Sequence, residues 1–100
     1  MMNITKTVEG KKLTVALEGR LDTLTAPELE ESLSSALEGI KELVLDLSGL
    51  EYLSSAGLRV VLSTFKTVSA AEGKMTICNA NEMVSKVFEL TGFGSIIAIE

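Results

Sequence analysis

The stretch "LDLSGLEYLSSAGLRVVLS", residues 45–63, decides the fold of this chain, because the spacing of its apolar residues changes midway. Its first part belongs to "ELVLDL", residues 42–47, a nearly all-apolar run typical of a strand that is covered on both faces. After Ser54 and Ser55 the spacing becomes helical. The helical positions are Leu58, Val61, Leu62, Phe65 and Val68. The stretch therefore predicts a strand, a serine-containing turn and a helix.

Toward the N-terminus, two segments predict a hairpin and a first helix. Residues 3–19, "NITKTVEGKKLTVALEG", are typical of two short strands joined at Glu9 and Gly10. The apolar residues on one face of this hairpin are Leu13, Val15 and Leu17. Residues 25–40, "TAPELEESLSSALEGI", change to helical spacing, and Thr25 and Glu28 have the spacing of a capping box at a helix start. The apolar stripe of this helix is Leu29, Leu33, Ala36, Leu37 and Ile40.

Toward the C-terminus, the pattern predicts another strand, a third helix and a closing strand. We expect the second helix to end before "AEGK", residues 71–74, with Gly73 as its left-handed terminal residue. "KMTIC", residues 74–78, is a second central strand. A helix over residues 81–94, "NEMVSKVFELTGFG", and a strand over "SIIAI", residues 95–99, follow. The apolar side of the third helix is Met83, Val84, Val87, Phe88 and Leu90.

The predicted elements alternate in the order ββαβαβαβ, which favours an α/β fold with a mixed β-sheet flanked by helices. Each strand–helix–strand unit favours a parallel, right-handed crossover, so the loops after the strands meet on one rim of the sheet. Asp22, Ser54, Ser55 and Asn81 follow successive strands. We therefore expect any functional site on that rim.

Length and composition favour a single domain over residues 1–100. A chain of 100 residues with 46% hydrophobic content can bury one core, and that core accounts for its apolar stripes, so we expect a monomer. No apolar run approaches the roughly 20 residues that span a bilayer, and "MMNITKTVEGKK" lacks the sections of a signal peptide. We expect a cytoplasmic protein with no membrane partner. The one cysteine, Cys78, fits a reducing compartment.

Charge and missing residue types exclude several functions. A net charge of −5 argues against a nucleic-acid partner. With no histidine and one cysteine, the usual tetrahedral zinc sites cannot form, and we expect no metal and no cofactor. A serine hydrolase would also lack its usual base, so the chain is not expected to be an enzyme. Asp46 ends a strand as in phosphorelay receivers, but the acidic cluster that such proteins need for magnesium is missing, and we interpret Asp46 as structural.

Two roles fit the serine pair in the turn. Serine is among the preferred helix caps, so one of the two is expected to cap the second helix. The free N–H groups at a helix start also favour an anion such as phosphate. One serine can cap while the other accepts a phosphate. Gly57, in the first turn, is explained equally well by tight packing against the sheet or by close approach of another backbone or a nucleotide.

Two stretches of the chain together resemble the STAS domain of bacterial anti-sigma factor antagonists, or anti-anti-sigma factors. They are "GRLDTLTAPEL" and "LVLDLSGLEYLSSAGLRVVL". The resemblance extends from the first hairpin to "VFELTGFGSIIAI" and rests on the order D-L-S-x-x-x-x-x-[SD]-S-[AST]-G-L. It implies a STAS-type mixed sheet flanked by helices. It also implies partner switching in transcription regulation. The unphosphorylated protein would bind an anti-sigma factor that is also its serine kinase, releasing the sigma factor, and a phosphatase would reset the phosphoprotein.

The resemblance implies the following site residues. The phosphorylated serine of the family falls on Ser55, and the family's acidic residue after the second strand falls on Asp22. Well-known members have aspartate immediately before the phosphoacceptor, whereas this chain has Ser54, so modification of Ser54 stays an alternative. Asp22 can equally be a solvated loop acid or a helix-entry cap. The expected partner-binding residues are Asp22, Thr23, Ser54, Ser55, Ala56, Gly57 and Arg59.

A second function fits the same resemblance. STAS domains also serve as subunits of other assemblies, such as a lipid-transport ATP-binding cassette complex. There the same rim would dock onto a partner without a phosphorylation cycle. The two functions share the fold and the rim and differ in whether a serine is modified.

Overall fold

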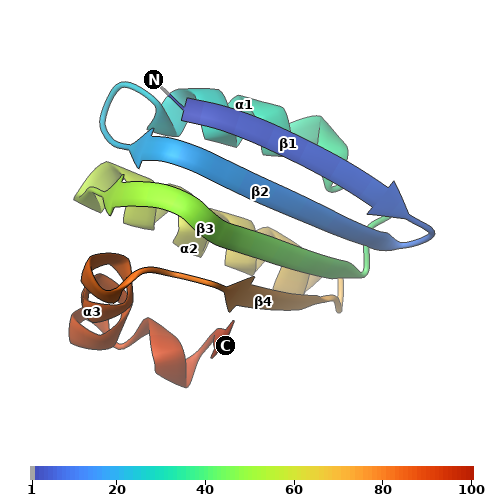
Figure 1. Cartoon of the computed structure of the whole chain (residues 1–100). Coiled ribbons are helices and arrows are strands. Elements are labelled where there is room, and N and C mark those ends of the chain that lie inside the picture. The colour runs from blue at the N-terminus through green and yellow to red at the C-terminus, as the bar shows by residue number, and fades with distance from the viewer. Residues whose placement is uncertain (1) are drawn as a thin grey trace.

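The computed structural model describes residues 2–100, which form a five-stranded sheet and three α-helices (Figure 1). The strands lie in the spatial order β1-β2-β3-β4-β5; the first pair is antiparallel and the others are parallel. The predicted order ββαβαβαβ is confirmed, with a short 3₁₀ helix, η1, added before the last strand. The elements are β1 (Met2–Glu9), β2 (Lys12–Leu21), α1 (Ala26–Ala36), β3 (Glu42–Leu53), α2 (Ser55–Ala70), β4 (Lys74–Cys78), α3 (Glu82–Thr91), η1 (Phe93–Ser95) and β5 (Ala98–Ile99).

Helices α1 and α2 lie on one face of the sheet, behind it in Figure 1. The strand order follows the chain order, so successive right-handed crossovers step in one direction and place their helices on the same face. The expectation that "ELVLDL" is covered on both faces is therefore wrong. Leu43, Leu45 and Leu47 are buried beneath the helices, whereas Val44 and Asp46 point to the opposite face and are half-buried.

The hairpin forms as predicted, one residue later than expected. Glu9 pairs with Lys12, which places the two-residue turn at Gly10 and Lys11 rather than at Glu9 and Gly10. Gly10 has a φ of +61°, a conformation that glycine adopts without strain. The predicted inner face of β2 is confirmed. Its residues Leu13, Val15 and Leu17 are almost fully buried.

Helix α1 starts where expected, but Thr25 does not cap it. The side chain of Thr25 makes no hydrogen bond to the helix, so the predicted capping box with Glu28 is wrong. The Thr25 hydroxyl instead donates to the carbonyl oxygen of Arg20, near the end of β2, at 2.8 Å. The helix ends at Ala36, so Ile40 is buried from the following turn and not from the helix.

The end of α2 uses a different residue from the one predicted. Glu72, with φ of 60°, takes the left-handed conformation that the sequence assigns to Gly73. Gly73 serves another purpose. A Cβ atom there would lie 2.9 Å from the carbonyl oxygen of Lys41 and 3.0 Å from a methyl of Val68. The glycine is therefore needed because the chain passes close to α2 and to the start of β3.

The C-terminal elements are shorter and more exposed than predicted. In α3, Val84 and Phe88 are buried and Val87 is half-buried, but Met83 is 52% and Leu90 77% exposed, so these two are not core residues. The last strand is limited to Ala98–Ile99 because η1 occupies the start of "SIIAI". Within residues 2–100, no helix combines the length and the apolar character needed to span a bilayer.

Candidate functional site

The parallel strands β2, β3 and β4 end at one rim of the sheet, on the left in Figure 1, as the sequence predicts. Hydrogen bonds join the three loops that start there. The backbone N–H of Ser54 donates to the carbonyl oxygen of Leu21 at 2.9 Å. The side-chain amide of Asn81 donates to the carbonyl oxygen of Leu50 at 3.0 Å. Asp22, Ser54, Ser55 and Asn81 thus lie in connected loops.

Asp22 organises the loop between β2 and α1. Its carboxylate accepts the backbone N–H groups of Leu24 at 3.0 Å and Thr25 at 3.1 Å, which is the geometry of an Asx turn. Its own N–H donates to the hydroxyl oxygen of Thr25 at 2.8 Å. Asp22 is therefore a loop acid that forms the turn leading into α1, a local structural role that the sequence analysis offers beside the partner-binding one. The carboxylate is also partly exposed, so it can still meet a partner.

The electrostatics of this loop favour an ionised Asp22. The N–H of Thr25 is the main cause that holds the pKa of Asp22 below its usual value, with smaller contributions from the Leu24 N–H, the Thr25 hydroxyl and Arg20. The Arg20 guanidinium lies 3.9 Å from the carboxylate. It also stacks on Tyr52 with its central carbon 4.2 Å from the ring centre, a cation–π contact. A charged group of each sign is thus held at the end of β2.

Ser54 is the cap of α2. It has extended backbone angles, φ of −94° and ψ of 173°, and its hydroxyl oxygen accepts the N–H of Gly57 at 3.2 Å. Its carbonyl oxygen accepts the N–H of Leu58, which starts the helix. The side chain is half-buried. Of the two serines, Ser54 therefore performs the structural role.

Ser55 is the first residue of α2 and its side chain is exposed. Within the part of the chain that the structure describes, its hydroxyl makes no hydrogen bond. Backbone N–H groups at a helix start lack intrahelical partners, and the first turn of α2 contains no acidic residue. The site can therefore take a group with negative charge without breaking an existing contact.

Gly57 is buried beneath this turn. A Cβ atom at this position would lie 2.7 Å from Leu21 and 2.8 Å from Leu53, the last residues of β2 and β3. Of the two explanations for this glycine, the structure supports tight packing against the sheet. Gly57 holds α2 against the strand ends, and the residues beside it form the surface.

Three of the expected partner-binding residues meet in a shallow hollow of about 380 Å³ between α1 and α2. Thr23 contributes from the loop, and Ala56 and Arg59 contribute from the first two turns of α2. The wall on the α1 side includes Pro27 and Glu30. The rim thus continues from Ser55 into a groove with one cation and one carboxylate on opposite walls.

Two further residues of the rim are structural. Asn81 caps α3 through its side-chain oxygen, which accepts the N–H of Val84 at 2.8 Å. Asp46 accepts the N–H of Ser48 at 3.0 Å and the side-chain amide of Asn79 at 3.1 Å. The Ser48 N–H, followed by the Asn79 amide, lowers the pKa of Asp46. The structure thus supports the structural interpretation of Asp46.

The sequence did not single out Leu24 or the Arg20–Tyr52 pair. Leu24 is 87% exposed although it stands in a loop fixed by the Asp22 turn. The signal in the sequence is a leucine between Asp22 and Thr25, the two residues that form the turn. Whether that leucine is exposed depends on the direction of the loop, which the sequence alone does not give. Arg20 and Tyr52 are partners in the β2–β3 register, which the sequence alone does not define. Among residues 2–100, no three His, Cys, Asp or Glu side chains are placed to hold a metal ion.

The fold agrees with the match to a known family. The STAS domain family matches residues 3–100, and the chain belongs to this family. A candidate anti-sigma factor antagonist of Bordetella bronchiseptica, BtrV, is 39% identical over 88 residues, which cover 87% of this chain and 76% of that protein. The anti-sigma-B factor antagonist of Staphylococcus aureus is 28% identical over 99 residues, covering 98% of this chain and 92% of that protein.

The fold also matches solved structures of SpoIIAA, an anti-sigma factor antagonist from Bacillus. Its unphosphorylated form superimposes with a TM-score of 0.85 at 20% identity and covers all of this chain and 88% of SpoIIAA. Its phosphorylated form superimposes with a TM-score of 0.77, also at 20% identity, and covers all of this chain and 91% of that one. The STAS-type fold predicted from the sequence is thereby confirmed.

Proposed function

We propose that this protein is an anti-sigma factor antagonist that is switched by phosphorylation of Ser55. Family membership and the names of its relatives support the antagonist function. In the proposed cycle, the unphosphorylated chain binds an anti-sigma factor that is also a serine kinase. The bound kinase releases its sigma factor, and a phosphatase acting on phospho-Ser55 restores the binding form. The chain acts as a cytoplasmic, monomeric binding protein and not as an enzyme.

The observation that carries the proposal is that the two serines have different hydrogen bonding and exposure. The hydroxyl oxygen of Ser54 accepts the N–H of Gly57, whereas Ser55 is exposed and its hydroxyl makes no hydrogen bond with the described residues. Phosphorylation of Ser54 would require loss of the cap, which contributes about 1 kcal/mol. Phosphorylation of Ser55 breaks no hydrogen bond among the described residues. This favours Ser55 over Ser54 as the acceptor.

The rim supports a partner-binding role for the residues around Ser55. Asp22 presents a fixed, ionised carboxylate, and Leu24 adds exposed apolar surface beside it. Thr23, Ala56 and Arg59 continue this surface into the hollow. A partner that docks over these residues would cover Ser55. A phosphate there adds roughly −1.5 to −2 charges to the interface, which opposes docking.

The test is labelling by the cognate kinase with ATP, followed by phosphopeptide mapping, of three proteins: the wild type, Ser54→Ala and Ser55→Ala. We expect Ser54→Ala to lose about 1 kcal/mol of stability, because the cap is lost, and still to be labelled. Ser55→Ala should melt like the wild type and remain unlabelled.

Phosphate mapped to Ser54 would contradict the assignment of the acceptor. A chain that binds no kinase and copurifies instead with subunits of a lipid transporter would contradict the proposed function and favour the alternative assembly.

A further inference from the structure

Helix α2 differs in charge from the rest of this acidic protein. The chain has a net charge of −5, and each of the other two helices carries more carboxylates than cations. Helix α2, "SAGLRVVLSTFKTVSA", contains two cations, Arg59 and Lys66, and no carboxylate. Arg59 stands one helical turn after Ser55, and both side chains are exposed. A cation so close to a helix start is disfavoured by the helix dipole, unless an anion is present there.

Helix geometry brings the Arg59 side chain within reach of Ser55. Residues four apart on a helix are surface neighbours, with Cβ atoms about 5–6 Å apart. Helical side chains also lean toward the N-terminus, so a long side chain covers the turn that precedes it. Arg59 also lines the hollow at the rim, together with Thr23 and with Ala56, the residue that follows Ser55.

Arg59 forms no ion pair with another side chain among the described residues. Within residues 2–100, no carboxylate lies within ion-pair distance of it, and the one ion pair at the rim joins Arg20 to Asp22. Glu30 lines the same hollow from α1 and is the carboxylate on the wall opposite Arg59. Arg20 is held by Asp22 and by its stacking on Tyr52. Arg59 is thus the cation that remains available for a phosphate on Ser55.

We propose that Arg59 binds the phosphate of phospho-Ser55 within the same molecule, an inference that rests on the function proposed above. A guanidinium matches phosphate oxygens in a two-pronged arrangement and stays charged at any physiological pH. The contact holds the phosphate over the first turn of α2, where the free N–H groups also point. It keeps the phosphate doubly ionised near neutral pH, where a free phosphoserine, with a second pKa near 6, begins to bind a proton. The phosphorylated form thereby keeps its full charge against the partner.

The test measures the phosphate directly. Phosphoserine is installed at position 55 by genetic encoding, and its second ionisation is followed by ³¹P nuclear magnetic resonance between pH 4.5 and 8 at low salt. The proteins are the wild type, Arg59→Gln, Arg59→Lys and, as the matched control, Lys66→Gln, which removes the other cation of α2 eleven residues from Ser55. Asp22 and Glu30, the carboxylates at the rim and in the hollow, stay in place in all four.

We expect Arg59→Gln to raise the pKa of the phosphate by at least about 0.3, the size of an exposed one-turn ion pair. Arg59→Lys should restore part of the difference, and Lys66→Gln should leave the value within about 0.1 of the wild type. Equal values in the wild type and Arg59→Gln would overturn the inference, as would an equal change in Lys66→Gln.

The two proposals can fail separately because the phosphoserine is installed without a kinase. If the phosphate pKa changes in Arg59→Gln but no kinase labels the chain, the contact is supported and the proposed switch is contradicted. If a kinase labels Ser55 but the phosphate pKa is the same in Arg59→Gln as in the wild type, only the contact is contradicted.

Discussion

Side chains contribute more to the hydrogen bonds at one end of the sheet than at the other. At the rim, a main-chain bond joins Ser54 to Leu21. Side chains add to it there, since the Asp22 carboxylate, the Ser54 hydroxyl and the side-chain oxygen of Asn81 each accept backbone N–H groups. At the opposite end, the main chain does this. The N–H of Lys41 donates to the carbonyl oxygen of Lys11 at 2.8 Å. The N–H of Lys74 in turn donates to the carbonyl oxygen of Lys41, also at 2.8 Å.

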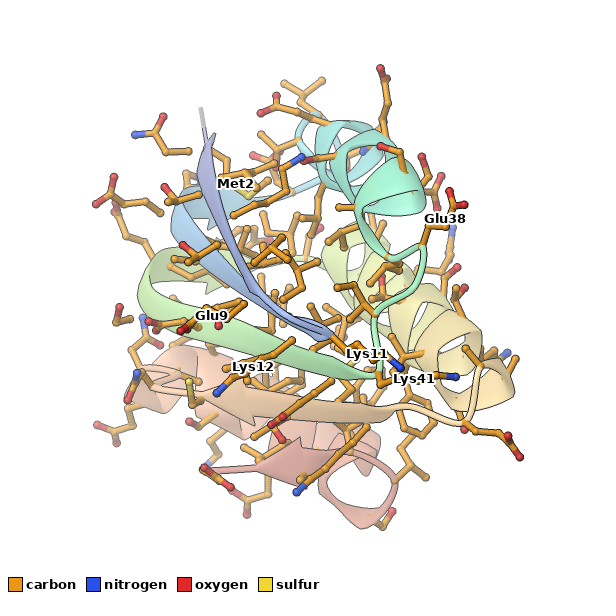
Figure 2. All side chains as sticks on the ribbon, turned by 90° about the vertical axis from the view of Figure 1, so that its right-hand side faces the viewer. Met2, Glu9, Lys11, Lys12, Glu38 and Lys41 are labelled. Atoms are coloured by element: carbon orange, nitrogen blue, oxygen red, sulfur yellow. The ribbon has the colours of Figure 1, made fainter. Side chains whose placement is uncertain are left out.

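Figure 2 looks directly at this opposite end. Charged side chains project at this end, among them Lys11, Lys12, Lys41, Glu9 and Glu38. These side chains do not close the loops, apart from Lys41, whose ammonium group donates to the carbonyl oxygen of Ala71 at 2.6 Å. Substitution of most of these side chains would leave the main-chain contacts intact.

The difference shows where residue identity matters in this fold. A loop closed by main-chain hydrogen bonds needs only space for the backbone, so many different side chains are tolerated there. Side-chain closure requires a given residue type at each position, and it leaves the neighbouring residues, such as Leu24 and Ser55, exposed in fixed places. Changes at the rim should therefore alter binding, whereas changes at the opposite end should alter stability only where the backbone is crowded.

The largest expected effect tests the crowded backbone at the opposite end. Gly73→Ala should lower the free energy of unfolding by about 2 kcal/mol, because its Cβ atom would meet carbonyl oxygens of Lys41 and Val68 at 2.9 and 3.1 Å. Partner affinity should not change in the folded protein. Gly94→Ala is the matched control, since its nearest contact would be Ile99 at 4.0 Å. Urea unfolding that finds Gly73→Ala as stable as the wild type would refute the idea of a crowded junction.

The second effect tests the rim. Phosphorylation of Ser55 should weaken binding to the kinase partner at least about tenfold, which corresponds to about 1.4 kcal/mol. The phosphate adds charge to an interface next to Asp22, while the N–H groups of the first turn compensate it within the folded chain. Stability should therefore change by no more than about 1 kcal/mol.

Calorimetric binding titrations and thermal melts of both forms measure this second effect. Ser55→Asp should reproduce it weakly, and Ser55→Ala should bind like the unmodified wild type. A phosphorylated form that binds equally well, or that fails to bind only because it has unfolded, would contradict the mechanism.

The smallest effect concerns pH. Because hydrogen bonds from Thr25 and Leu24 lower the pKa of Asp22 in the folded protein, its ionised form stabilises the fold above the usual pKa near 3.8. This contribution is lost as the pH falls through the lower, folded value. Asp22→Asn should therefore be less stable than the wild type at neutral pH, and the difference should shrink below about pH 4. Melts from pH 7 to pH 3 test this, with exposed Glu51→Gln as the control. A difference that does not depend on pH would argue against the carboxylate turn.

The fold was predictable from this sequence because its apolar spacing is clear in each element. A period of two residues in β2 and of three to four in α2 defines a strand and a helix from local residues alone. The order of these elements then limits the topology to parallel crossovers whose strands end at one rim. Asp22, Ser54 and Ser55 could be assigned to that rim for the same reason.

Some assignments failed where the outcome depends on contacts between distant segments. Periodicity marks an apolar face but does not say whether another element covers it. Met83 and Leu90 lie on such a face of α3 and are exposed, while one side of β3 is left without a helix. The left-handed residue after α2 is Glu72 because Gly73 is needed for the close passage of Lys41, a residue 32 positions earlier.

The sequence by itself determined the elements, their order and the placing of two adjacent serines at the start of α2. It did not distinguish the serines, because both have the same hydroxyl and both suit a helix start. The tertiary structure decided between them. Ser54 is tied through its N–H to Leu21 of β2, which fixes its backbone in the capping conformation and turns its hydroxyl toward Gly57. Ser55, one residue further, already belongs to the helix and projects into solvent, since a single step along the chain separates the two backbone conformations.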